Sequence, residues 1–126
     1  MLSEFFNLPP SPIEELFEET LTKNQVRLFV KRDDLLHSSV SGNKFRKLKY
    51  NFLQIEELGC QRLATCGGAF SNHIHATAAA GKHFGIETIG IIRGERTEPL
   101  NTTLHFAELC GMKLYFISRS DFRDKS

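Results

Sequence analysis

The chain has 126 residues, of which 40% are hydrophobic and 25% charged, a composition ordinary for one globular domain with its own core. The net charge is +1 and the basic and acidic residues are mixed, so no nucleic-acid partner is expected. No membrane partner is expected either, because no apolar run approaches a spanning length and the N-terminus does not resemble a secretory signal.

The N-terminal part predicts a short helix and then a strand. Ser11, Pro12 and Glu14 fit the N-cap, the first helical position and a capping box, so we expect a helix over about residues 13–20. The apolar residues within 27–31 predict a strand.

A longer helix is predicted to begin at Asn43. Asp33 and Asp34 end the preceding strand, and the serine-rich residues 37–42 predict a loop. Gly59 fits a left-handed C-terminal cap for the helix. Apolar side chains recur along one helical face at Phe45, Leu48, Phe52 and Ile55.

Strands and helices alternate in the rest of the chain. We expect strands at residues 63–66, 88–92 and 113–117, a helix at residues 72–84, and a second helix that Asn101 caps and that runs through Leu109. Apolar strands separated by helices predict an α/β fold with a parallel sheet covered on both faces. The alanines of the first of these helices would let it pack close to the sheet. Residues 119–126 are polar and predict no further strand or helix.

Cysteine usage indicates a reducing compartment. Cys60, Cys66 and Cys110 are odd in number and have no CxxC spacing, so they predict neither a disulfide framework nor a zinc site. We expect them to be small buried side chains in a cytoplasmic protein.

Lys44 is a candidate amine nucleophile at the first turn of its helix. A lysine amine is ordinarily protonated at neutral pH, but burial or the positive end of a helix lowers its pKa. Arg46 and Lys47 add like charge nearby. An isolated lysine at a helix start is most often simply solvated, and the residues around Lys44 lack the glycine spacing of a P-loop.

A second candidate site follows the strand at residues 63–66. Gly67 and Gly68 predict a tight turn, and Ser71 or Asn72 would cap the next helix, whose free amides favour a carboxylate or phosphate. His73 beside this turn is either a polar pocket wall or a packed histidine. No metal is expected, because His73 and His75 lie two residues apart and point to different sides of a helix.

Three ordered motifs give the chain a family resemblance. They are residues 30–35 (Val-Lys-Arg-Asp-Asp-Leu), residues 41–48 (Ser-Gly-Asn-Lys-Phe-Arg-Lys-Leu) and residues 67–73 (Gly-Gly-Ala-Phe-Ser-Asn-His). In order and spacing the chain resembles the 1-aminocyclopropane-1-carboxylate deaminase and D-cysteine desulfhydrase family. These are pyridoxal-phosphate enzymes of the tryptophan-synthase-β-like fold, also called fold type II.

The resemblance implies a covalent cofactor site. Lys44 would carry the Schiff base of pyridoxal 5'-phosphate and act as the catalytic base, with Asn43 as a further cofactor residue. Asn72 would hydrogen-bond the ring hydroxyl of the cofactor. Ser71 would be catalytic and hold the substrate carboxylate together with Asn72 and His73.

The resemblance also implies the reaction. A deaminase or lyase of this family converts a small amino acid, such as 1-aminocyclopropane-1-carboxylate or D-cysteine, into a 2-oxo acid and ammonia, with sulfide from D-cysteine. Full-length members would be homodimers. Two residues depart from the commoner pattern and affect the substrate expected: Phe70 replaces a frequent glutamine, and His75 replaces a frequent arginine.

Family members are more than twice as long as this chain. We therefore expect an N-terminal fragment, with residues 1–48 in the large cofactor domain and residues 49–126 in an incomplete small α/β domain, without the glycine-rich phosphate loop. The alternative is an inactive truncated module that binds a carboxylate or phosphate, or a partner of a full-length relative. A flavodoxin-like nucleotide binder would not explain residues 41–48.

Overall fold

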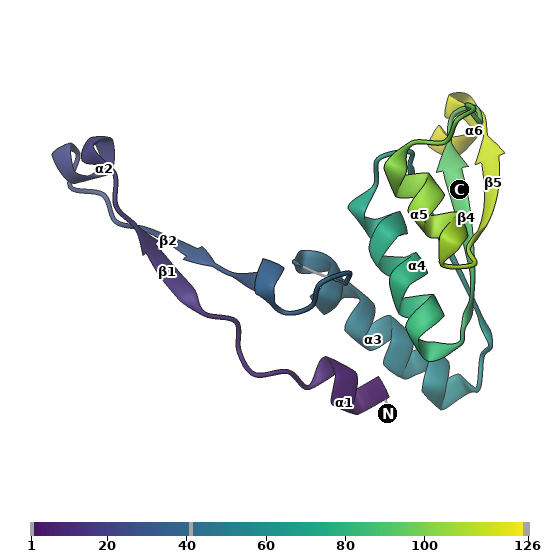
Figure 1. Ribbon diagram of the computed structural model, residues 1–126, viewed down its shortest axis with the longest axis horizontal. Coiled ribbons are helices and arrows are strands. Elements are labelled where there is room, and N and C mark those ends of the chain that lie inside the picture. Colours follow the sequence, from purple (N-terminus) through teal and green to yellow (C-terminus); the bar gives the residue numbers. More distant parts are fainter. Residues whose placement is uncertain (1, 41, 125–126) are drawn as a thin grey trace.

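The computed structural model describes residues 2–40 and 42–124, so Ser41 of the lysine motif and residues 125–126 lie outside the described residues. The sequence of elements is mixed α/β (Figure 1). In chain order the elements are α1 (Leu2–Phe6), β1 (Ile13–Leu16), α2 (Glu19–Lys23), β2 (Leu28–Lys31), the 3-10 helix η1 (Asp33–Leu35), α3 (Asn43–Leu58), β3 (Arg62–Gly68), α4 (Asn72–Phe84), β4 (Glu87–Arg93), α5 (Thr102–Leu109), β5 (Lys113–Ile117) and α6 (Arg119–Arg123).

The N-terminal third contains a protruding antiparallel hairpin of β1 and β2, which we call the arm (residues 13–31), with α2 at its tip (Figure 1). The predicted strand is confirmed, but the predicted helix over residues 13–20 is wrong. Ser11 donates its hydroxyl hydrogen to Asp33 and does not cap a helix, and Glu14 pairs with Arg32 across the hairpin. Strand pairing therefore overrides the local capping pattern.

Helices α3 and α4 agree with the sequence. The apolar face predicted for α3 is buried, and Gly59 ends the helix at φ 64°, the left-handed conformation expected of its cap. Helix α4 begins and ends at the predicted residues, with Gly85 as a second left-handed cap at φ 68°. Helix α5 begins after its predicted cap, Asn101, whose side chain accepts a hydrogen bond from the Leu104 amide.

Among the described residues, β3, β4 and β5 form a parallel sheet in that order, as predicted. Strand β3 is longer than predicted and includes Gly67 and Gly68, so the turn before α4 consists of Ala69 and Phe70. On β4 the side of the sheet that faces the helices is fully buried at alternate residues, namely Thr88, Gly90 and Ile92.

The described residues form two apolar clusters, and helix α4 lies between them. One cluster joins α4 to α1, α3 and the loop before α3, and the other joins α4 to the sheet and α5. The alanines serve both sides: Ala76 and Ala80 belong to the first cluster and Ala78 to the second. The first cluster comprises Phe6, Val40, Phe45, Leu48, Phe52, Ala76 and Ala80. The second comprises Ile74, Ala78, Ile92, Leu104, Ala107 and Met112.

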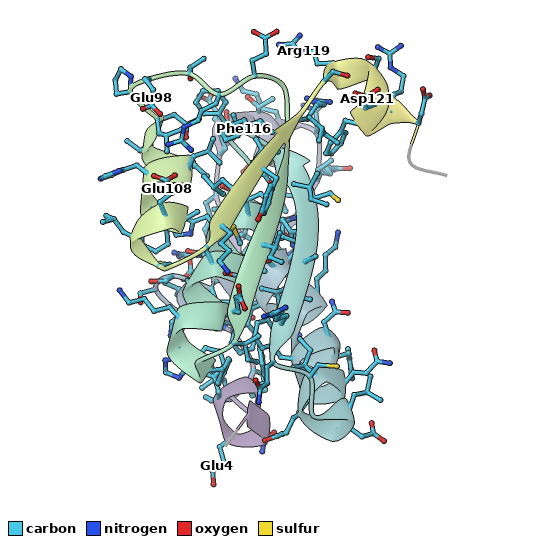
Figure 2. All side chains as sticks on the ribbon, turned by 90° about the vertical axis from the view of Figure 1, so that its right-hand side faces the viewer. Glu4, Glu98, Glu108, Phe116, Arg119 and Asp121 are labelled. Atoms are coloured by element: carbon cyan, nitrogen blue, oxygen red, sulfur yellow. The ribbon has the colours of Figure 1, made fainter. Side chains whose placement is uncertain are left out.

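The opposite face of the sheet is open. Figure 2 looks onto this face, and no helix of the described chain lies across its centre. Tyr115 on this face is 56% exposed. The helices thus cover one face of the sheet and not both. Cys66 on the same face and Cys60 before β3 are exposed, so the prediction of burial is wrong for these two cysteines, while Cys110 is half-buried.

The chain's last described element is the short helix α6, which the polar composition of residues 119–126 did not predict. The Ser118 side chain caps it by accepting a hydrogen bond from the Asp121 amide at 3.1 Å. In the described part of the chain, every helix is too short or too polar to span a bilayer.

Candidate active site

The beginnings of α3 and α4 meet at a cavity of about 300 Å³. Three of the predicted site residues, Asn43, Lys44 and Asn72, line it together. Because the helices pack side by side in the first apolar cluster, residues far apart in sequence meet at their N-terminal ends. The remaining lining residues are Ser38, Ser39, Gly42, His75 and Ala76.

Lys44 is a half-buried residue in the first turn of α3. Its Nζ donates a hydrogen bond to Oδ1 of Asn43 at 2.9 Å. Gly42 precedes the helix with φ 63° and ψ −148°, a conformation that is open essentially to glycine alone. The sharp change of direction at Gly42 therefore allows Lys44 to start a helix directly beside the loop that forms the cavity wall.

Asp33 fixes this turn to the rest of the chain. Its backbone carbonyl accepts a hydrogen bond from the Gly42 amide at 2.9 Å, and its carboxylate receives the Arg46 guanidinium at 2.5 and 2.8 Å. Hydrogen bonds from Arg46 and then from Ser11 lower the pKa of the Asp33 carboxyl well below its usual range. The charge of Arg46 is thus paired with Asp33. The sequence predicts that Asp33 ends a strand and belongs to the motif at residues 30–35, but it predicts no role for Asp33 at this turn.

Ser71 caps α4 and leaves one amide free to meet a ligand. Its Oγ accepts hydrogen bonds from the amides of His73 at 3.2 Å and Ile74 at 3.3 Å. The first amides of a helix have no partner within the helix, so the Asn72 amide is the one that this cap leaves over. Gly67 lies close to the Ser71 side chain, and a Cβ at Gly67 would come within 2.9 Å of Ser71 Oγ. An anion at this end of α4 would meet the Asn72 amide and the Ser71 hydroxyl.

The two histidines in the first turn of α4, His73 and His75, have different surroundings. His73 is half-buried, and burial, followed by the charges of Lys44 and Lys47, lowers its pKa. His73 is not among the residues that line the cavity, whereas His75 is, with its ring stacked on Phe106 at a centroid distance of 3.9 Å. In the described residues, no three His, Cys, Asp or Glu side chains gather as metal ligands would.

The sequence reasoning missed the loop wall of the cavity. The serine-rich sequence at residues 37–42 predicts only a loop and carries no signal that Ser38 and Ser39 belong to a site. His75 was noted as an unusual residue for the family, and helical spacing from Asn72 places it within about one turn of that residue. That spacing could have identified it as a second α4 residue at the cavity.

These features define a class of protein: an α/β domain with a lysine and a capped helix start at one cavity. No family model matches the chain. The chain is 34% identical over 117 residues to a Thermotoga maritima protein named "Putative 1-aminocyclopropane-1-carboxylate deaminase", covering 92% of this chain and 36% of that protein. A Pyrococcus abyssi protein of the same name is 41% identical over 70 residues, which is 56% of this chain and 21% of that protein.

Solved structures agree with these relatives. The crystal structure of an ACC deaminase homologue superposes with a TM-score of 0.72 and 26% identity, over 92% of this chain and 37% of that one. A fungal L-serine ammonia-lyase from Rhizomucor miehei, at 19% identity, has a TM-score of 0.62 over 88% of this chain and 33% of that one. The chain is therefore similar to 1-aminocyclopropane-1-carboxylate deaminase homologues and has part of their type II fold. It spans about a third of their length.

Proposed function

We propose that the cavity is the lysine side of a pyridoxal-phosphate site in a deaminase or lyase that acts on a small amino acid. The observation that carries the proposal is the meeting of Lys44 and Asn72, from two different helix starts, at one cavity. When bound, pyridoxal phosphate supplies an aldehyde that amines attack and a ring that withdraws electrons from the α-carbon of an amino acid. The amine, the amide groups and the cavity fit such a group.

The cofactor side of the proposed site consists of three residues. Lys44 provides the amine that attaches the cofactor covalently. Asn43, which already accepts a hydrogen bond from Lys44 Nζ, orients that amine. Asn72 is exposed at the cavity and offers a side-chain amide for a ring hydroxyl. His73, whose pKa is lowered mainly by burial, follows Asn72 in α4 but does not line the cavity.

The substrate side of the proposed site is the first turn of α4. The Ser71 hydroxyl and the Asn72 amide can both donate to a carboxylate, and the positive end of the helix favours that charge. The Lys44 amine would also serve as the base that accepts the α-proton of the substrate. The products would be a 2-oxo acid and ammonia, with sulfide from D-cysteine.

The proposal extends to organisation. Residues 1–48 would belong to a large cofactor domain and residues 49–126 to a small domain. The chain corresponds to about a third of its relatives, so the complete reaction is proposed for a protein that also contains the equivalent of their remaining length. We propose a homodimer for that protein.

Covalent trapping tests the proposal. Pyridoxal phosphate is added, the protein is reduced with borohydride, and the modified peptide is mapped. We expect the label on Lys44, its loss in Lys44→Ala, and its retention in the control Lys49→Ala, which changes a lysine of α3 whose amine lies near Tyr50. A label that persists on another lysine in Lys44→Ala, with Lys44 unmodified in the parent, would falsify the assignment.

The uncapped backbone amide of Asn72 favours a second function, in which the chain binds an anion but catalyses no reaction. In that case the Asn72 amide resonance shifts when acetate or inorganic phosphate is added, equally in the parent and in Lys44→Ala. If the shift occurs and no lysine is trapped, the chain is a carboxylate- or phosphate-binding module. If Lys44 is trapped, the enzymatic proposal stands.

A further inference from the structure

The ring of His37 accepts two hydrogen bonds from the loop that walls the cavity. The backbone amides of Ser39 and Val40 both donate to His37 Nδ1 at 3.1 Å. Ser39 and its neighbour Ser38 line the cavity that contains Lys44. Val40, only 1% exposed, is anchored in the first apolar cluster beside Phe45 of α3. The ring thus joins one wall of the cavity to the core.

These contacts require one protonation state. Nδ1 can accept the two amide hydrogens only when it carries a lone pair, which leaves the proton of the neutral ring on Nε2. In the imidazolium both ring nitrogens carry hydrogen, and Nδ1 would then confront the amides of Ser39 and Val40 donor to donor. Protonation of His37 and the observed loop conformation are therefore incompatible.

The surroundings of the ring oppose protonation as well. His37 packs against Phe5 of α1 at a centroid distance of 4.9 Å and faces His83 of α4 at 6.4 Å. Burial, and then the charge of His83, lower the pKa of His37 below its usual value. Among the described residues, His83 is the titratable group whose charge acts on the His37 ring. Because the folded state favours the neutral ring, this contribution to stability is present above the unfolded pKa of about 6.5 and is lost as the pH falls from there through the folded value.

We propose that His37 is a positioning residue whose neutral ring holds the Ser38–Val40 segment as a wall of the Lys44 cavity, so that acidification releases that wall. The inference rests on the proposed function only where it concerns the reactivity of Lys44. The coupling between the ring and the loop is a property of the chain itself and has its own measurement.

The test follows the full chain by NMR from about pH 8 to about pH 5, across the ordinary range of histidine. We expect neutral His37 with its proton on Nε2, and the Ser39 and Val40 amide shifts to move with the same midpoint as the His37 ring. We also expect protection of the Val40 amide against hydrogen exchange to fall about tenfold or more when the ring is protonated. A neutral ring with its proton on Nδ1, or loop amides indifferent to the His37 midpoint, would overturn the proposal.

Three variants separate the acceptor from the ring. In His37→Asn, Oδ1 lies as many bonds from the backbone as Nδ1 and accepts at every pH, so the loop amides should keep their neutral-pH shifts without this titration. In His37→Phe the ring remains but the acceptor is gone, so the loop should be released at all pH values. His83→Asn should raise the His37 midpoint and leave the coupling intact. If the loop amides behave alike in His37→Asn and His37→Phe, the proposal is contradicted. If His37→Phe does not fold, the comparison of the parent with His83→Asn still tests the coupling.

Trapping with pyridoxal phosphate and borohydride at neutral pH then tests the link to Lys44. We expect labelling of Lys44 to be slower in His37→Phe than in His37→Asn. If Lys44 is labelled equally in both variants, the loop does not position the lysine and that part of the inference fails. If no variant is labelled at Lys44 while the amides still follow His37, the proposed function fails and the coupling stands.

Discussion

At the scale of single residues, Asp33 connects three parts of the chain. Its carboxylate joins Ser11, which precedes the arm, to Arg46 on α3, and its carbonyl receives the Gly42 amide at the turn before Lys44. The pair with Arg46 is partly exposed, with the Asp33 side chain 20% exposed. The Asp33–Arg46 pair therefore fixes the geometry at the cavity more than it adds to the stability of the fold.

The lowered pKa of Asp33 predicts an acid-dependent contribution to stability. The folded state favours the carboxylate, so the contribution is present above the unfolded pKa of about 3.9 and is lost as the pH falls below it. We expect Asp33→Asn to lower the urea midpoint at neutral pH and to differ less from the parent in acid. The control Asp34→Asn breaks an exposed pair with Arg32 and should have the smaller effect at neutral pH. A constant gap between Asp33→Asn and parent from neutral to acid pH would contradict the assignment.

The Ser71 cap gives a second prediction at this scale. Ser71→Ala removes the acceptor for two amides of α4 and should lower the free energy of unfolding by about 1 kcal/mol, measured by urea denaturation. Ser118→Ala, which removes the cap of the five-residue helix α6, should cost less, because that helix has no buried residue among those described. Equal losses in the two variants would argue against a structural role for the Ser71 cap.

At the scale of elements, the sequence predicted those parts of the fold whose signals are local. The apolar face of α3, the caps of α4 and α5 and the strands of the parallel sheet are all confirmed. Strand β1 was not predictable in this way, because Ser11 and Glu14 carry a helix-start pattern and only pairing with β2 decides against it. At the candidate site, the motifs predicted that Lys44 and Asn72 belong to one site. The cavity wall at Ser38 was not predictable, because it depends on the path of a loop.

Close packing of α4 on the sheet gives a prediction at this scale. A Cβ at Gly81 would lie 2.3 Å from Thr88 Cγ2 and 2.9 Å from the Ile86 carbonyl oxygen. Gly81→Ala should therefore lower the free energy of unfolding by about 1–3 kcal/mol, measured by urea denaturation, despite the better helix propensity of alanine. In the control Gly68→Ala, the new Cβ would lie 3.8 Å from Arg93 Nη2, an ordinary contact distance, so this variant should change stability little. A neutral Gly81→Ala would mean that α4 can move away from β4.

At the scale of the whole molecule, stability is concentrated around α4. Both apolar clusters include residues of α4, whereas the arm leaves large apolar side chains exposed, with Phe17 at 85%. Exposed large apolar side chains are most concentrated in the arm, and the chain spans about a third of the length of its relatives. The distribution of burial is therefore uneven between the arm and the α/β part.

A matched pair of truncations measures this distribution. Phe52 belongs to the first cluster and is 0% exposed, so Phe52→Ala should lower the free energy of unfolding by about 3–5 kcal/mol. Phe17→Ala in the arm removes the same atoms from an exposed position and should have almost no effect on the urea midpoint. Similar losses in the two variants would show that the arm is packed in solution.

The position of α4 between the two clusters has a consequence for unfolding. Neither cluster can persist once α4 has left, because each would lose the alanines against which its larger side chains pack. Heating should therefore melt the α/β part as one cooperative unit, and a ligand seated at the start of α4 should raise the melting temperature of both clusters together.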